Sequence, residues 1–420
     1  MLRILISTPA WRRWTLASLL ARMPVSMALL GVMLAVKEVT GSLGTGSQVV
    51  GVMTISAGLL GPVAGRRLDR RELRFALQLR CAALGATFAV MALCVVLRTP
   101  TWTFFAVSLA GGVTLAGVWG GFRALLLVVI PPEQRRHAHF VESLMIEITY
   151  GVGPLSIGLL IGLTNAVVGL VLMASFSFAA TLSLLRLPHH APHGTPRVGA
   201  PWRHPAFATV YVFGFFLGMA FGAVESNVAA RMGDFGLDSS AAGGFIGLLG
   251  VSSCIGGLWV SLRPMRTSDP MKTASIMFTV FGFSILPSVF APNAWIFGAV
   301  LLIASFMLVP LNGLGAAEVE AGASDGQRAE AFAYLMAATQ MGSGLGVLLN
   351  GTLSGVLSAR SIPFLSAVIL LTLAVTMAVV RGTSIRRSAT LVVIDGHAPA
   401  YPTGEEPLSP PRTSTGSAAS

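Results

Sequence analysis

The stretch that decides the fold is Gly61–Arg74, GPVAGRRLDRRELR, which lies between two long apolar runs. It carries five arginines and two acidic residues within fourteen positions. The runs on either side are each about twenty residues long, which is enough to cross the hydrocarbon core of a bilayer. A charged segment between two such runs must lie at a membrane face, and its excess of arginine predicts that this face is cytoplasmic.

The composition of the whole chain also indicates a membrane protein. Hydrophobic residues make up 54% and charged residues 11%, with a mean hydropathy of +0.76, whereas soluble domains carry about 25% charged residues. The formal net charge of +11 would suggest a nucleic-acid partner in a soluble protein. Here the arginines cluster in the loops of one side, which predicts membrane orientation and contact with anionic lipid, and no nucleic acid is expected as a partner.

Twelve apolar segments are long enough to cross about 30 Å of hydrocarbon as helices. Barrel strands would alternate with a period of two, and these runs are continuous and rich in Gly and Ala, so helices are predicted. The expected class is an all-α membrane protein of twelve transmembrane helices in two pseudo-symmetric six-helix bundles. The approximate limits of the segments are 13–36, 45–64, 75–97, 102–129, 138–162, 166–187, 206–230, 240–262, 273–291, 294–316, 329–357 and 361–381.

Basic residues concentrate in alternate loops. The poorer set of loops holds only Lys37, Arg98, Arg231 and Arg360, so both termini are predicted to be cytoplasmic. Lysine is nearly absent beside abundant Arg, Ala and Gly, a bias typical of GC-rich bacterial genomes. We therefore expect a multi-pass protein of the bacterial inner membrane.

The longest internal connection divides the chain into two halves of about six spans each. The predicted organisation is a bundle at 1–187, a cytoplasmic linker at 188–205, a second bundle at 206–381 and a disordered tail at 382–420. The pattern L-M-x5-G-x-G supports an internal repeat. It occurs at Leu144, Met145, Gly151 and Gly153, and again at Leu335, Met336, Gly342 and Gly344.

The opening stretch resembles the loop between helices 2 and 3 of the major facilitator superfamily, whose pattern is roughly G-x-x-x-D-R-x-G-R-K/R. Gly65, Asp69, Arg70 and Arg74 match it, whereas Glu72 and Leu73 depart from it. The resemblance in layout covers about residues 12 to 381. It implies a transporter whose two bundles rock around a central site, with the four matching residues forming a cytoplasmic latch on neighbouring helix ends. A topology signal without a latch is the alternative.

Small residues four apart let helices approach closely, which is the packing we expect of Gly61 and Gly65.

The fifth segment contains Gly151, Gly153, Pro154 and Gly158, in the sequence GVGPLSIG. It resembles part of the G-P-x-x-G-G signature of drug:proton antiporters in the same family, although Ile157 replaces one glycine. Proline in mid-span permits a bend, and ordinary kinked packing is the alternative to a functional role. The resemblance implies proton-driven export of a small apolar or amphipathic compound.

Ionisable residues inside spans are few, and each is costly to bury. The candidates for proton coupling or a cavity charge network are Glu147, Glu142, Arg22, Arg123 and Glu225. Opposite charges at similar depth predict a paired network in the N-terminal half, in which Glu147 or Glu142 changes protonation during transport. A static ion pair that locks helices 4 and 5 is the alternative, and Glu225 could instead snorkel to the interface.

Polar residues at Asn227, Asn312 and Gln340 are candidates for the substrate cavity, with interhelical hydrogen bonds as the alternative. The histidines of the linker, His189, His190, His193 and His204, lack cysteine or acidic partners, so no metal site is expected. No Walker lysine motif occurs, and no cofactor is expected.

These features together predict a secondary active transporter that works by proton-coupled export, with small-molecule substrate, protons and lipid as partners and a monomer as the default state. Proton-coupled uptake of a sugar, amino acid or other metabolite is the alternative. A membrane enzyme or sensor is disfavoured, because the intramembrane charges are few and no segment is large enough for a soluble domain. No catalytic residues are expected.

The latch hypothesis predicts that Asp69→Asn reduces transport with little loss of expression, because the variant removes the acid without adding bulk. Transport rate per molecule of purified protein is the measurement. Unchanged turnover would leave the loop as a topology signal only.

Overall fold

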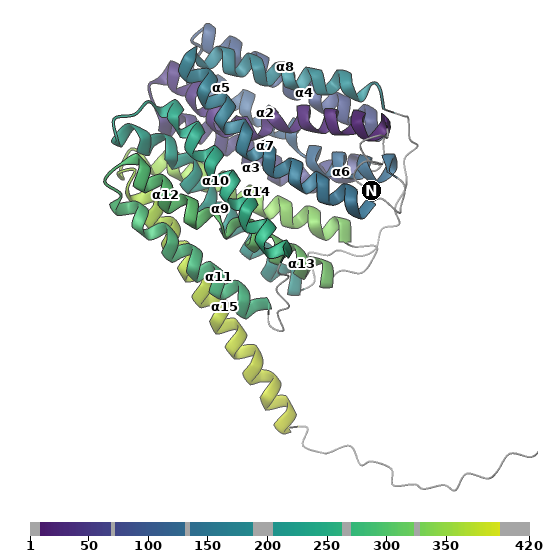
Figure 1. The fold of residues 1–420 in the computed structure, drawn as a ribbon, viewed down its shortest axis with the longest axis vertical. Helices are drawn as coiled ribbons and strands as arrows, with labels where there is room; N and C mark the ends of the chain where they lie inside the picture. The colour runs from purple at the N-terminus through teal and green to yellow at the C-terminus, as the bar shows by residue number, and fades with distance from the viewer. Residues whose placement is uncertain are drawn as a thin grey trace, which may run out of the picture. The chain divides into compact units, whose positions relative to one another are not determined.

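A computed structural model describes residues 9–68, 72–130, 135–187, 205–262, 270–322 and 328–394, and within these ranges it contains helices and no strands (Figure 1). The predicted all-α class is therefore confirmed. The helices are α2 (Pro9–Thr40), α3 (Leu43–Leu68), α4 (Leu73–Val96), α5 (Thr101–Leu115), α6 (Val118–Val129), α7 (Arg135–Leu163), α8 (Ala166–Leu184), α9 (Pro205–Asp234), η3 (Ser239–Ala241), α10 (Ala242–Leu262), α11 (Pro270–Ile285), η4 (Leu286–Phe290), α12 (Ala294–Ser305), α13 (Leu308–Gly322), α14 (Arg328–Leu353) and α15 (Ser361–Ile394).

Twelve stretches of the described chain are long and apolar enough to cross a membrane, as predicted. Consecutive spans cross in opposite directions, so α2, α4, α7, α9, α11 and α14 all begin on one side. We call this the terminal side and the other the far side. Residues 1–378 form one compact unit that contains the first predicted bundle and the second except for its last three residues, and the boundary between the bundles stays a prediction.

The second unit, residues 379–420, is helical as far as Ile394. We had expected a disordered tail from residue 382, so the start of the tail was placed too early for residues 382–394. The reason lies in the sequence, since residues 383–394 contain neither proline nor glycine. The expectation for residues 395–420 lies outside the described residues.

The fourth span of each half is broken in the middle. In the first half, α5 ends at Leu115 and α6 begins at Val118, with Gly117 between them at a φ of 79° that favours glycine. In the second half, α12 ends at Ser305 and α13 begins at Leu308. Pro310 lacks the N–H that would bond to the carbonyl of residue 306, which explains the second break. Interrupted helices at matching places in two halves are typical of transporters.

Glycine packing corrects the register of the internal repeat. Gly151 and Gly158 lie against α10 of the other half, and Gly344 and Gly351 lie against α3. Gly153 and Gly346 instead contact neighbours within their own halves, on α2 and α9. The motif G-x-G-x4-G at 151, 153 and 158 therefore matches 344, 346 and 351. The predicted alignment was wrong by two residues, because it paired glycines that pack on different helices.

Two helix pairs join the halves, and we call them the α3–α14 seam and the α7–α10 seam. A Cβ atom at Gly51 would lie 2.8 Å from the carbonyl oxygen of Gly344, and one at Gly158 would lie 2.7 Å from the Cα of Gly243. Such spacing lets the two backbones meet, as small residues do at membrane helix interfaces. At the far side, Lys37 Nζ donates a 2.8 Å hydrogen bond to Ser239 Oγ across the halves.

Arg231 is not a loop residue, contrary to expectation. It lies in α9 with its side chain fully buried, bonded to Asp234 at 2.8 Å. The guanidinium also lies 4.6 Å from the ring centre of Phe235 and 5.3 Å from that of Phe297. These contacts compensate the buried charge. Arg231 lies in the last turn of α9, so it remains one of the few basic residues of the far side.

The seam geometry predicts that Gly51→Ala destabilises the protein by about 1–3 kcal/mol, because a methyl group has no room between α3 and α14. Gly313→Ala is the matched control, since no described atom lies within 4 Å of its Cβ position. The control should be neutral or slightly stabilising, because alanine favours helix. Thermal unfolding in detergent tests this, and equal stability of the two variants would contradict tight packing at the seam.

Candidate functional site

Two arginines converge on one glutamate near the terminal side of the first half. Arg22 Nη2 on α2 donates to Glu142 Oε1 on α7 at 2.7 Å, and Arg123 Nε on α6 lies 3.3 Å from Glu142 Oε2. The side chains of Arg22 and Glu142 are 2% and 1% exposed, whereas that of Arg123 is 49% exposed. Arg22 and Glu142 therefore form a buried pair, to which Arg123 adds a partly solvated charge.

An aromatic stack extends this pair towards the other half. The guanidinium of Arg22 lies 5.1 Å from the ring centre of Trp119, which follows the break between α5 and α6. Trp119 in turn stacks on Tyr150 of α7, with ring centres 6.0 Å apart and planes 7° apart. Tyr150 is within electrostatic range of Glu147 and of Glu225 on α9. We call Arg22, Trp119, Tyr150, Glu147 and Glu225 the central cluster.

The two glutamates of the central cluster come from different halves. Glu147 accepts a 3.3 Å hydrogen bond from Ser253 Oγ on α10, at the α7–α10 seam. Glu225 has no hydrogen-bonding or ion-pair partner among the described residues. Glu147 is five positions after Glu142, which turns the two side chains about 140° apart on one helix. For this reason Glu147 does not join the Arg22 pair, although their depths are similar.

Arg80 was missed by the sequence reasoning. It lies on α4 about 10 Å along the helix from Leu73 and donates through Nη1 to carbonyls at the end of α5. Val113 and Thr114 accept at 3.2 Å and 3.4 Å, and Ala116 also accepts. The break after α5 leaves these carbonyls without helical hydrogen-bond donors. Arg80 donates to them in a region where lipid offers no donor. The signal was an arginine inside the apolar run predicted at 75–97, where every ionisable residue is a candidate.

The predicted latch is only partly described. Asp69 and Arg70 lie outside the described residues. Arg74 Nη1 donates to the carbonyls of Leu187 at 2.8 Å and Leu185 at 3.3 Å, at the C-terminal end of α8. Such a contact stabilises a helix end. Among the described residues, no atom of a neighbouring element lies within 4 Å of the Cβ position of Gly65, so close packing there stays a prediction.

Close packing was also expected of Gly61, which does lie near another helix. Its Cβ position is 4.0 Å from Cβ of Ala337 on α14, which is ordinary van der Waals contact.

The glycines and proline of the fifth span serve packing on two faces of α7. Gly151, Pro154 and Gly158 face α10, and Gly153 faces Ser26 on α2. The helix is continuous from Arg135 to Leu163, and a functional bend at this place stays a prediction.

The polar residues proposed for a substrate cavity have different surroundings. Asn227 is buried and donates through Nδ2 to the carbonyl of Ala359 at 2.8 Å, in the turn between α14 and α15. Asn312 is exposed and donates to Leu308 in its own helix at 3.1 Å. Gln340 is half-buried on α14 at the position that matches Glu147 in the corrected repeat. The linker histidines lie outside the described residues.

Comparison with known proteins identifies the fold. A sequence-family model described as Major Facilitator Superfamily matches residues 14–321. No individually curated protein matches the sequence. Among solved structures, the nucleoside transporter NupG is 16% identical with a TM-score of 0.65, covering 87% of this chain and 98% of that chain.

Two further solved structures give the same result. The human organic anion transporter MFSD10 (TETRAN) is 14% identical with a TM-score of 0.65, covering 87% of this chain and 98% of that chain. The POT family transporter PepTSo is 11% identical with a TM-score of 0.71, covering 89% and 98%. These likenesses confirm the predicted fold, and at such identities they say nothing of the substrate.

The buried pair predicts unequal effects of two substitutions. Glu142→Gln leaves the guanidinium of Arg22 buried without its counter-charge and should destabilise the protein by about 3–5 kcal/mol. Arg123→Gln removes a half-exposed charge and should cost less than about 1 kcal/mol. Replacing both members of the pair, as Arg22→Met with Glu142→Met, should recover most of the loss. Thermal unfolding in detergent is the measurement, and equal losses for the two single variants would refute the asymmetry.

Proposed function

The chain belongs to the major facilitator superfamily and is a membrane transporter of that type, and from this premise we propose that it exports a small apolar or amphipathic compound in exchange for protons by alternating access. Two halves joined along glycine-lined seams, each with a broken fourth span, suit rocking about a central site. The subtype that we propose is similar to the drug:proton antiporters of this superfamily.

One observation carries the proposal: the central cluster holds two carboxylates, one from each half, and neither is in an ion pair among the described residues. A carboxylate inside a membrane is costly unless a proton or a cationic group neutralises it. If proton and substrate compete for the same carboxylates, binding of one releases the other. Competition of this kind drives the two in opposite directions across the membrane, because each favours a different state.

The arginine pair has a different role in this proposal. Glu142 already has Arg22 as a counter-charge, so it is a poor proton carrier. The pair instead holds Arg22 against Trp119, which stacks on Tyr150 near both Glu147 and Glu225. We therefore assign proton exchange to Glu147 and Glu225 and a positioning role to Arg22, Arg123 and Glu142.

The arginine-rich terminal side supports a cytoplasmic location of both termini and a place in the bacterial inner membrane. In that orientation the Lys37–Ser239 hydrogen bond lies on the outer face and joins the halves there. Release of substrate to the outside then requires this bond to break.

Direction of transport separates export from the alternative of uptake. Purified protein would be reconstituted in proteoliposomes loaded with a pH-sensitive dye, under an imposed proton gradient, with a panel of lipophilic cations, antibiotics, sugars and amino acids. Proton flow opposite to the added compound supports export by exchange. Proton flow in the same direction as a sugar or amino acid overturns export and establishes symport.

The assignment of proton exchange predicts that Glu225→Gln and Glu147→Gln each abolish substrate-triggered proton flow, because an amide cannot exchange a proton. Glu318→Gln is the control, since Glu318 is also in a candidate span but lies near the terminal end of α13. The initial rate of dye response per reconstituted protein is the measurement. Normal flow in Glu225→Gln would remove that residue from the mechanism.

A further inference from the structure

Arg80 on α4 holds the break in the fourth span of the first half. Its Nη1 atom donates to the carbonyl oxygens of Val113 at 3.2 Å and Thr114 at 3.4 Å, and also to that of Ala116. In a continuous helix each of these carbonyls would accept from the amide four residues later, but α5 ends at Leu115. One side chain therefore joins the end of α5 to the first residue of the break.

The break itself does not fix the angle between α5 and α6. Gly117, at a φ of 79°, has no side chain, and glycine adopts several other backbone conformations at little cost. The direction in which α6 leaves the break must therefore be set by contacts with other helices. Arg80 supplies a polar contact just before α6. Trp14 supplies one further along, since its Nε1 atom donates to the carbonyl of Phe122 at 3.0 Å.

The direction of α6 decides where two functional side chains lie. Trp119 is the second residue of α6; it contacts the guanidinium of Arg22 and stacks on the ring of Tyr150. Arg123 follows one turn later and lies 3.3 Å from Glu142. A change in the angle at the break would displace both side chains together, because a helix of only twelve residues moves as a unit.

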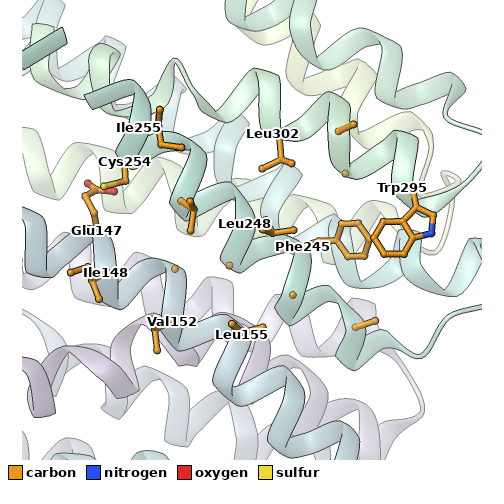
Figure 2. A pocket seen from close by; sticks show the side chains of 17 residues that line it. Glu147, Ile148, Val152, Leu155, Phe245, Leu248, Cys254, Ile255, Trp295 and Leu302 are labelled. Carbon is orange, nitrogen blue, oxygen red and sulfur yellow. The ribbon is translucent and has the colours of Figure 1, made fainter. Parts of the chain in front are cut away.

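The stack of Trp119 on Tyr150 leads to the two carboxylates to which proton exchange is assigned. Tyr150 is three residues after Glu147 on α7, so the two side chains are neighbours on the helix surface, and Glu225 on α9 is within electrostatic range. Figure 2 shows Glu147 beside Cys254 of α10, in the second half. A displaced Trp119 would therefore leave Tyr150 without its stacking partner where the two halves meet.

The second half satisfies its broken span in a different way. There the carbonyl of Leu302 on α12 accepts from the hydroxyls of Ser252 at 2.6 Å and Ser305 at 3.1 Å. Hydroxyl groups thus serve the break of the second half. A guanidinium serves the break of the first half, whose α6 carries part of the central cluster.

We propose that Arg80 is a positioning residue for proton exchange. By holding the break it fixes the direction of α6, and so keeps Trp119 stacked on Tyr150 in the central cluster. The proposal rests on the proposed transport function and adds to it a residue outside the central cluster. Proton exchange depends steeply on the positions of the groups around it, so a contact at the break can control a rate at the α7–α10 seam.

The donor pattern predicts which substitutions preserve this role. All three bonds described for Arg80 start at one nitrogen atom. An ammonium group is also one nitrogen and has three donors, so Arg80→Lys should hold the break. Arg80→Gln retains an amide donor and should release the break in part, and Arg80→Met has no donor and should release it fully. A purely steric role would be kept by methionine as well as by lysine.

Fluorine NMR of the full-length chain in lipid nanodiscs tests the position of Trp119 without any substrate. Protein labelled with 5-fluorotryptophan has seven labelled sites, and Trp119→Leu identifies the Trp119 resonance. We expect Arg80→Met to shift or broaden this resonance, and Arg80→Lys to restore it. Arg360→Met, which removes an exposed arginine of the second half, should leave it unchanged. Unchanged resonances of Trp259 and Trp295 in Arg80→Met show that the variant is folded.

The consequence for transport is measured with ethidium as the probe in the proteoliposome assay. Ethidium-triggered proton flow should fall about tenfold in Arg80→Met, a size typical of coupled residues in one network, and should recover in Arg80→Lys. In a Trp119→Leu background, Arg80→Met should have no further effect on the rate, because the proposed role acts through Trp119. Rates are compared per reconstituted protein.

An unchanged Trp119 resonance in folded Arg80→Met, or a resonance that Arg80→Lys does not restore, would overturn the proposal. Additive losses in Arg80→Met and Trp119→Leu would contradict it too, because they would show that Arg80 does not act through Trp119. These failures leave proton exchange at Glu147 and Glu225 untouched. Absence of proton flow in the wild type with every compound of the panel would instead contradict the proposed function, and the resonance test would still decide whether Arg80 positions Trp119.

Discussion

Lipid offers no hydrogen-bonding partner, and most of this structure follows from that constraint. A helix satisfies its own backbone, so every described span is helical. Where a span is broken, another group must replace the lost bonds, and Arg80 does so for the carbonyls at the end of α5. Arg22 and Glu142 satisfy each other in the same way. Glu225 has no hydrogen-bonding or ion-pair partner among the described residues, which is the reason that we propose a role for it in proton exchange.

The same constraint explains why the halves meet through glycine. Apolar side chains gain nothing from leaving lipid for a neighbouring helix, so association depends on close packing. The contacts of Gly51 with Gly344 and of Gly247 with Gly151 supply it at pseudo-symmetric places. The symmetry ends at Glu147, whose counterpart is Gln340. One seam therefore carries a carboxylate and the other does not, so the two seams differ chemically.

The sequence predicted the number of spans well, because hydropathy over twenty residues averages out local detail. It also included Arg22, Arg123 and Glu142 in one predicted charge network. Depth along a helix does not say which face a side chain occupies until the neighbours are known, so Glu147 was grouped with Arg22 although it lies at the seam. The chain has 47 glycines, and nothing in the sequence distinguishes Gly117 as the one at which a span breaks.

The glycine seams have a mechanical consequence. Where Gly44 meets Gly351 and Gly158 meets Gly243, backbone lies against backbone. Side chains that interlock must change rotamer before helices can shift, and each such change adds to the barrier. Helix faces lined by glycine have no side chains that must change rotamer. The halves therefore stay in close contact while the barrier to sliding is low. The glycines that make the contact tight therefore also let the two helices slide past each other.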